Sequence, residues 1–176
     1  MAASDSGNVW AVGGTFSSTK AEALVLRFDG KRWKKQPLPR VEGRARLNAV
    51  ATAPDGTVWA VGEIRTPDGT ESGLALRWDG RSWKRIALPD RTVSIEKATF
   101  GKGEVVLLAQ TAGAGPAALR RAGDTWVSLG LPTTVKGRPL SPFDISGHGD
   151  TIDVTGVLPG EPPGSTGPGI VLTARR

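Results

Sequence analysis

Three aspartates surround the only histidine of the sequence. Asp144, Asp150 and Asp153 stand close to His148. Carboxylate oxygens are the ligands that calcium and magnesium prefer, so the three aspartates are weak candidates for a metal site. The alternative is that the last unit of a repeat array exposes a polar face to solvent, as terminal repeats do. The sequence favours this second interpretation, and we expect no metal and no cofactor.

Basic residues form the second group that could do chemistry. Guanidinium and ammonium groups pair with carboxylates and with sulfate or phosphate oxygens. We expect the candidates to lie on loops that connect strands, and to bind an anionic glycan or an acidic patch of a protein partner. The alternative is that they are ordinary solvated loop residues. The candidates are Arg44, Arg46, Arg65, Arg91, Lys136 and Arg138.

The sequence lacks the residues that several classes of catalysis require. The sequence has no Cys and no Tyr, so it offers no thiolate nucleophile, no disulfide and no Cys-based zinc site. One histidine among turn residues does not define a catalytic triad, and no glycine-rich phosphate loop leads into a helix with a lysine. We expect a non-catalytic binding module. The alternative is a fragment of an extracytoplasmic hydrolase or lyase whose catalytic residues lie outside this chain.

The elements that carry these residues belong to an internal repeat. Residues 6–39 read SGNVWAVGGTFSSTKAEALVLRFDGKRWKKQPLP, and residues 55–89 read DGTVWAVGEIRTPDGTESGLALRWDGRSWKRIALP. Trp33 and Trp83 are about 50 positions apart, and two weaker copies follow. A fixed period of this length indicates a repeat architecture.

Each repeat unit predicts four strands. In the clearest unit they cover residues 47–53, 58–63, 73–78 and 82–87, and the Asp-Gly pair at 79–80 predicts the turn between the last two. The corresponding units cover approximately residues 1–39, 47–89, 94–132 and 141–176, and the last unit lacks its fourth strand.

Four antiparallel strands in about 45 to 50 residues are typical of a β-propeller blade. We therefore expect an all-β chain with a single propeller domain over residues 1–176. It contains about four four-stranded blades, the last incomplete, and forms part of a larger ring. The alternatives are a closed four-bladed ring with an imperfect seam, and a homodimer in which two copies complete one propeller.

The recurring VWAVG and the following L-x-L-R-[FW]-D-G-x-x-W-K resemble kelch-like propellers and the central-domain propeller of galactose oxidase, found in many secreted or surface-anchored bacterial proteins. The resemblance implies the fold and an extracellular or cell-surface location. The copper chemistry and the sialidase chemistry of such folds use Tyr, which this sequence lacks. The D-G-x-x-W turn is also similar to the Asp box of sialidase-type propellers, but it places Asp and Trp one position closer.

The remaining conspicuous residues have structural explanations. Trp10, Trp33, Trp59, Trp83 and Trp126 recur at repeat positions, so we expect them to pack blade against blade. The net charge of +6 is concentrated around residues 27–35 and 77–85, which we place on outer strands, where charged side chains discourage edge pairing. These charges do not converge on one groove with exposed aromatics, and we expect no nucleic-acid partner. No apolar run is long enough to span a membrane.

Overall fold

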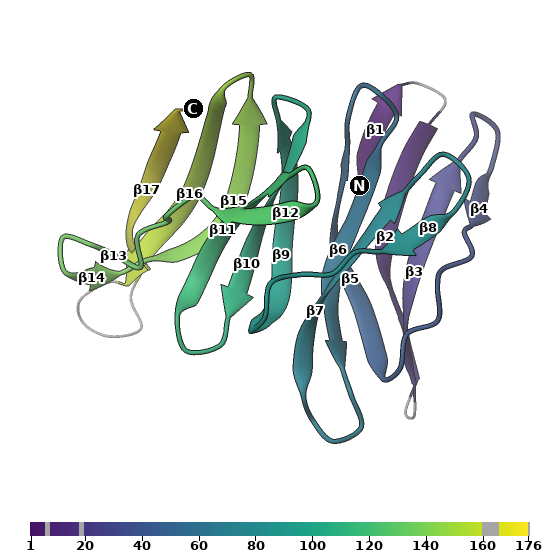
Figure 1. Cartoon of the computed structure of the whole chain (residues 1–176), viewed down its shortest axis with the longest axis horizontal. Helices are drawn as coiled ribbons and strands as arrows, with labels where there is room; N and C mark the ends of the chain where they lie inside the picture. Colours follow the sequence, from purple (N-terminus) through teal and green to yellow (C-terminus); the bar gives the residue numbers. More distant parts are fainter. Residues whose placement is uncertain (6–7, 18–19, 160–165, 176) are drawn as a thin grey trace.

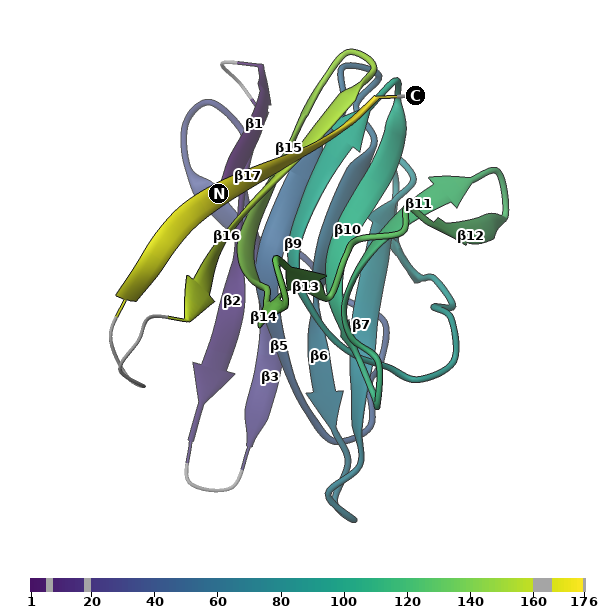
Figure 2. The same cartoon turned by 90° about the vertical axis from the view of Figure 1, so that its left-hand side faces the viewer.

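The computed structural model describes residues 1–5, 8–17, 20–159 and 166–175. Three antiparallel sheets have four strands, one has three, and a separate hairpin has two. The four larger sheets stand side by side in chain order (Figure 1), and each is twisted along its strands (Figure 2). This part of the chain contains no helix that is long and apolar enough to cross a membrane.

Each larger sheet is one blade, built from strands that are consecutive in the chain. Blade 1 contains β1 (Ala2–Asp5), β2 (Asn8–Phe16), β3 (Ala21–Phe28) and β4 (Trp33–Lys35). Blade 2 contains β5 (Arg44–Thr52), β6 (Val58–Arg65), β7 (Glu71–Trp78) and β8 (Trp83–Arg85). Blade 3 contains β9 (Thr92–Gly101), β10 (Glu104–Thr111), β11 (Gly115–Ala122) and β12 (Thr125–Ser128). Blade 4 contains β15 (Ser141–His148), β16 (Thr151–Pro159) and β17 (Thr166–Arg175).

The predicted all-β propeller architecture is confirmed. The strands expected in each repeat, four in the first three units and three in the last, are present where the sequence placed them, with somewhat different ends. One element was not predicted. A short hairpin of β13 (Thr134–Val135) and β14 (Arg138–Pro139) stands between blades 3 and 4. Its turn consists of Lys136 and Gly137, which both adopt a positive φ, of 52° and 74°. Two residues with positive φ match the twist of a tight hairpin.

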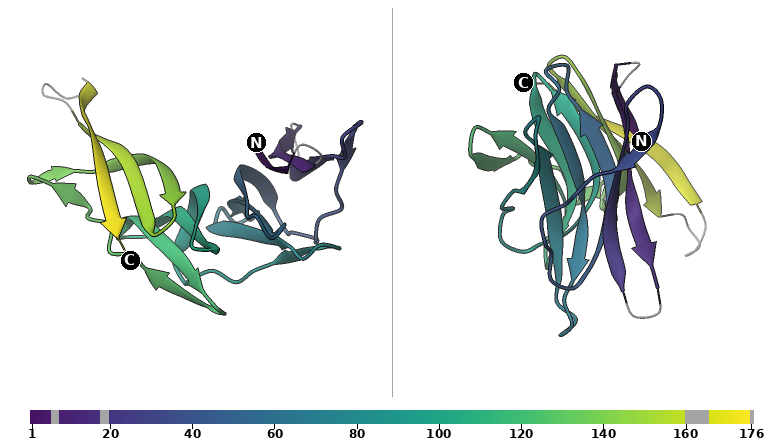
Figure 3. Two further views of the ribbon diagram at one scale, coloured as in Figure 1. Left: turned by 90° about the horizontal axis from the view of Figure 1, so that it is seen from above. Right: turned by 90° about the vertical axis from the view of Figure 1, so that its right-hand side faces the viewer.

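The blades follow one another along an arc. The first strands of neighbouring blades, β5, β9 and β15, contact one another in succession. Seen from above, blades 1 and 4 lie at the two ends of this arc (Figure 3). The buried apolar residues form three clusters, one at each junction between successive blades. The core is therefore divided among the junctions, as stacked repeats require.

Tryptophans fill the first two junctions. Trp10 on β2 contacts Trp83 of blade 2, with ring centroids 5.4 Å apart and an interplanar angle of 86°. Trp59 on β6 contacts Trp126 of blade 3 in the same way, at 5.8 Å and 76°. These contacts confirm the predicted blade-to-blade packing. For Trp33 the prediction is wrong, because its ring contacts Phe28 of its own blade and 44% of its surface is exposed.

The Asp-Gly turns between the third and fourth strands are held by the aspartate. In blade 2, the Asp79 carboxylate accepts hydrogen bonds from the backbone N–H groups of Arg81 (2.9 Å) and Ser82 (2.7 Å), and it pairs with Lys84 at 3.0 Å. Asp29 forms the equivalent contacts in blade 1. These hydrogen bonds hold the pKa of both carboxyl groups well below the ordinary value.

Candidate binding site between the first two blades

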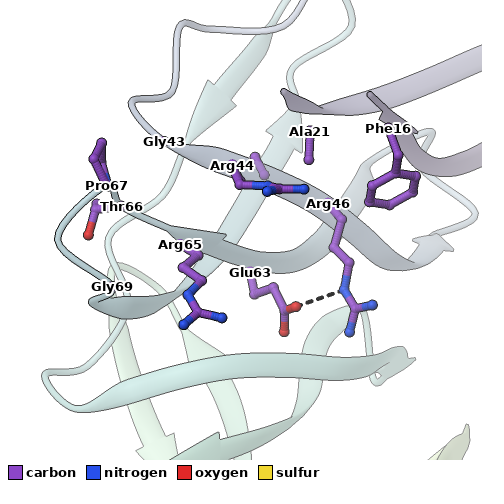
Figure 4. Close-up of a pocket in the computed structure, with 11 residues that line it drawn as sticks. Phe16, Ala21, Gly43, Arg44, Arg46, Glu63, Arg65, Thr66, Pro67 and Gly69 are labelled. Atoms are coloured by element: carbon purple, nitrogen blue, oxygen red, sulfur yellow. Dashed lines mark ion pairs between the residues drawn. The ribbon is translucent and has the colours of Figure 1, made fainter. Parts of the chain in front are cut away.

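A pocket of about 650 Å³ lies where blades 1 and 2 meet, beside the turn between β6 and β7 (Figure 4). This volume falls within the usual range for sites that bind small ligands. Three of the six basic candidates line it, and one carboxylate lies among them. The lining comprises Phe16, Ala21, Gly43, Arg44, Ala45, Arg46, Glu63, Arg65, Thr66, Pro67 and Gly69.

The charged residues are placed by the register of two adjacent strands. Arg44 lies opposite Arg65, and Arg46 lies opposite Glu63, so all four side chains share one face of the β5–β6 pair. The Nε atom of Arg46 is 2.7 Å from Oε1 of Glu63. Figure 4 shows Arg65, Glu63 and Arg46 projecting in the same direction from the two strands. Three guanidinium groups against one carboxylate give this pocket a positive lining.

The prediction that these arginines lie on loops is wrong. Arg44 and Arg46 belong to β5, and Arg65 is the last residue of β6. Between and beside the arginines, Ala45 and Leu47 are buried, so the segment alternates between exposed and buried side chains. An alternation of polar and apolar residues is the pattern of a half-buried strand. The Arg-Ala-Arg-Leu sequence at residues 44–47 has this alternation and therefore indicated a strand.

The Arg46–Glu63 pair is specific to blade 2 among blades 2 to 4. The counterparts at the same cross-strand position are Ser94 with Gln110 in blade 3 and Ser141 with Val157 in blade 4. The Arg46 and Glu63 side chains are 51% and 31% exposed. An exposed ion pair contributes only about 0–1 kcal/mol to stability. Neither the repeat nor a large contribution to stability accounts for this pair.

A glycine brings the connection before β5 close to the turn after β6. Gly43 has a φ of +96°, and a Cβ atom at this position would lie 2.5 Å from the carbonyl oxygen of Arg65. Any larger residue would therefore push the two segments apart. Because Arg44 follows directly, this close approach also sets where its side chain begins.

The turn between β6 and β7 forms a well-bonded wall of the pocket. The backbone N–H of Thr66 donates to the carbonyl of Thr70 at 3.0 Å, and the N–H of Thr70 donates to the Asp68 carboxylate at 3.1 Å. The Thr66 hydroxyl also donates to Asp68. The hydrogen bonds that the Asp68 carboxylate accepts, first that from the Thr66 hydroxyl and then that from the Thr70 N–H, lower the pKa of Asp68.

An exposed aromatic ring completes the site. Phe16, the last residue of β2, is 66% exposed and lies beside the Arg46 side chain (Figure 4). We did not predict it as a site residue. The sequence could have indicated it, because Phe16 occupies the repeat position that Arg65 occupies in blade 2, so the two blades differ there.

The other three basic candidates lie at later junctions. Arg91 precedes β9 with a φ of 69°, and its carbonyl accepts a hydrogen bond from the N–H of Ala112 at 2.9 Å. Lys136 stands in the turn of the β13–β14 hairpin, and Arg138 lies on β14. The structure therefore brings Arg44, Arg46 and Arg65 together, and it places the remaining candidates elsewhere.

The three candidate metal ligands are not brought together. Asp150 pairs with Lys102 at 3.0 Å, and Asp153 accepts a hydrogen bond from the Thr173 hydroxyl at 2.6 Å. Asp144 lies on β15, opposite Thr155 rather than opposite Asp153. In the described part of the chain, no group of three or more His, Cys, Asp or Glu side chains is arranged to hold a metal ion.

No protein-family model matches the sequence, and no curated protein matches it. Similarity is found among solved structures. YCF48 bound to a D1 peptide superposes with a TM-score of 0.51 at 16% identity, over 96% of this chain and 67% of that chain. Aleuria aurantia lectin in complex with α-methyl-L-fucoside superposes with a TM-score of 0.56 at 16% identity, over 94% and 61% of the two chains. The same lectin with Fucα1-6GlcNAc gives 0.56 at 15% identity, over 94% and 62%.

These similarities define the fold. The chain is a β-propeller array of antiparallel blades, and it spans less than two thirds of the matched lectin chains. At such low sequence identities the function of the matched proteins cannot be assigned to this chain. The kelch-like resemblance and the extracellular or cell-surface location stay predictions.

Proposed function

We propose that this chain is a non-catalytic propeller module that binds an anionic glycan in the pocket between blades 1 and 2. The observation that carries the proposal is the set of Arg44, Arg46, Glu63 and Arg65 on one face of β5 and β6, beside an exposed Phe16. Propellers of similar fold provide a precedent, since Aleuria aurantia lectin was solved with fucosides.

Each part of the pocket suits a different part of such a ligand. A guanidinium group presents parallel N–H donors that match the two oxygens of a carboxylate or a sulfate. The Glu63 carboxylate accepts hydrogen bonds from sugar hydroxyls, and its ion pair with Arg46 holds both side chains in place. The exposed ring of Phe16 offers an apolar face to the C–H groups of a pyranose.

The proposal is tested with a heparin-derived tetrasaccharide, a neutral maltotetraose and an acidic oligoglutamate peptide as probes. Removal of one charge-assisted contact in Arg46→Gln is expected to weaken tetrasaccharide binding about tenfold. The matched control is Arg85→Gln, which removes the same charge from an exposed position on β8 of the same blade. Its affinity should stay within about twofold of the unchanged chain.

Calorimetry at two salt concentrations gives the affinities, and thermal unfolding verifies that both variants are folded. Equal losses in the two variants would mean that binding follows overall charge, and the pocket would then have no specific role. Tighter binding of the acidic peptide than of the tetrasaccharide would replace the glycan with a protein ligand.

A further inference from the structure

A second pocket adjoins the pocket that Arg44, Arg46 and Arg65 line, which we call the arginine pocket. The adjoining pocket has a volume of about 300 Å³ and also lies between blades 1 and 2. Three residues line both pockets, Ala21, Gly43 and Ala45. A glycine and two alanines have the smallest side groups, so the shared wall leaves room for a ligand that reaches from one pocket into the other.

The connection between β4 and β5 forms one wall of the adjoining pocket. Residues 36–41 line the pocket, and the rings of Pro37 and Pro39 restrict the backbone because they fix φ. Leu38 and Val41 are partly buried against the apolar cluster between blades 1 and 2. The wall is therefore stiff and anchored at two points to the packed core.

The lining of the adjoining pocket continues the positive charge of the arginine pocket. Lys35 on β4 and Arg40 on the connection line it, and both are exposed. Among the residues that the structure describes, neither takes part in an ion pair. Glu22 is the carboxylate in this lining, so two cations face one anion. An acidic group on a ligand would find an unpaired guanidinium at Arg40.

The next junction shows that Arg40 departs from the repeat. There Arg85 and residues 86–89 line a pocket between blades 2 and 3, and Arg85 occupies the repeat position of Lys35. Five positions further along the chain the charge is reversed, because Asp90 stands where blade 1 has Arg40. The pocket at this junction also shares no lining residue with the arginine pocket. Arg40 therefore belongs with the other departures from the repeat that gather between blades 1 and 2.

We propose that the adjoining pocket is a second subsite of the glycan site, and that the ligand is an oligosaccharide with acidic groups on at least two of its sugars. This inference rests on the proposed function. One acidic group binds in the arginine pocket, and a second pairs with Arg40, assisted by Lys35. The sugars between them pass over Ala21, Gly43 and Ala45.

Two subsites make the affinity depend on chain length. A monosaccharide occupies one pocket at a time, whereas two linked acidic sugars make the second contact intramolecular and raise the affinity through effective concentration. A polyanion that is attracted only by overall charge would respond equally to the loss of any exposed arginine. The two modes of binding therefore differ in whether Arg40 has a special effect.

The test compares galacturonic acid with tetragalacturonate, in which every sugar carries the same carboxylate. NMR titration gives the affinity of the monosaccharide, and calorimetry gives that of the tetrasaccharide. Four acidic sugars raise the chance of filling a single subsite only about fourfold. With a second subsite the ratio of the two affinities exceeds this value, and we expect the tetrasaccharide to bind about thirtyfold more tightly.

Variants of the chain locate the second contact. Arg40→Gln should lower the ratio of affinities at least about fivefold, because it removes a charge-assisted contact that requires the longer ligand. The matched control is Arg85→Gln, which makes the same change beside the equivalent pocket of the next junction. Its ratio should stay within about twofold of that of the unchanged chain. Arg46→Gln should weaken both ligands by a similar factor, because Arg46 lies in the arginine pocket.

Two outcomes would overturn this inference alone. One is a ratio of about fourfold or less in the unchanged chain, and the other is an equal reduction of the ratio in Arg40→Gln and Arg85→Gln. In both cases the glycan would still occupy the arginine pocket. If neither ligand shows saturable binding, the proposed function fails, and this inference fails with it. Thermal unfolding verifies that the three variants are folded.

Discussion

The junction between blades 1 and 2 and the junction between blades 3 and 4 fill equivalent space with different residues. In the first, Trp10, Trp78 and Trp83 form a cluster with ring centroids 5.4 to 5.7 Å apart. In the second, aliphatic residues such as Val106 and Ile152 form the core. The difference shows that the same blade arrangement accommodates an aromatic or an aliphatic core at its junctions.

The middle of the β5–β6 pair and the end that reaches the pocket show a second contrast. Near the middle of these strands, Val61 and Leu47 are buried and repeat with the blade. At the end that reaches the pocket, Arg46 and Glu63 depart from the repeat. The buried residues therefore recur from blade to blade, whereas the residues of the candidate site do not. This is expected when function is added to a rigid scaffold.

The largest expected effect on stability comes from removing a tryptophan from the junction between blades 1 and 2. Trp10 is 2% exposed, and Trp10→Ala should lower the free energy of unfolding by about 3–5 kcal/mol. Val106→Ala, at the same repeat position in blade 3, removes less buried surface and should cost about 2 kcal/mol. Urea unfolding measures both values. Equal losses would contradict the view that aromatic rings contribute more to the first junction than aliphatic side chains do to the last.

A smaller effect on stability is expected from substituting the glycine that occupies the same repeat position in blades 1 and 2. A Cβ atom at Gly62 would lie 2.1 Å from the carbonyl oxygen of Arg46, whereas one at Gly13 would meet no atom within 4 Å. Gly62→Ala should therefore destabilise the chain by about 1–3 kcal/mol. Gly13→Ala should change stability by less than about 0.5 kcal/mol. Thermal unfolding of the two variants tests this, and a similar loss in both would refute the assigned close approach at blade 2.

The smallest effect concerns the Asp-Gly turns in acid. The pKa values of Asp29 and Asp79 are lowered in the folded chain, so their ionised forms stabilise it above the unfolded value of about 4. This stabilisation is lost progressively as the pH falls below that value. The melting temperature of the unchanged chain should thus drop more steeply below about pH 4 than that of an Asp29→Asn, Asp79→Asn double variant. Parallel curves would show that the turns contribute nothing measurable.

Local pattern was sufficient to predict the blades. The VWAVG runs predicted β2 and β6, and the recurrence of Trp10 and Trp59 predicted their packing against the next blade. These features depend on short-range periodicity and on the repeat itself. The fourth strands of blades 1 to 3 were placed correctly for the same reason.

The pocket could not be predicted in the same way, because it depends on contacts between blades. Whether Phe16 approaches Arg46 is set by how blade 1 stacks on blade 2. Whether Trp33 is buried depends on a neighbour that its repeat position does not reveal. Asp144 and Asp153 were close in sequence, but strand pairing placed each opposite another residue.

The most direct test of the glycan site is to locate where an anionic sugar binds. Backbone and side-chain resonances are followed by NMR while glucuronic acid is added, with glucose as the neutral control. We predict saturable shifts at Phe16, Arg44, Arg46 and Arg65 with glucuronic acid and none with glucose. Shifts confined to the exposed basic side chains of β4 and β8, or no saturable shift with either sugar, would contradict the proposal that this pocket binds anionic glycans.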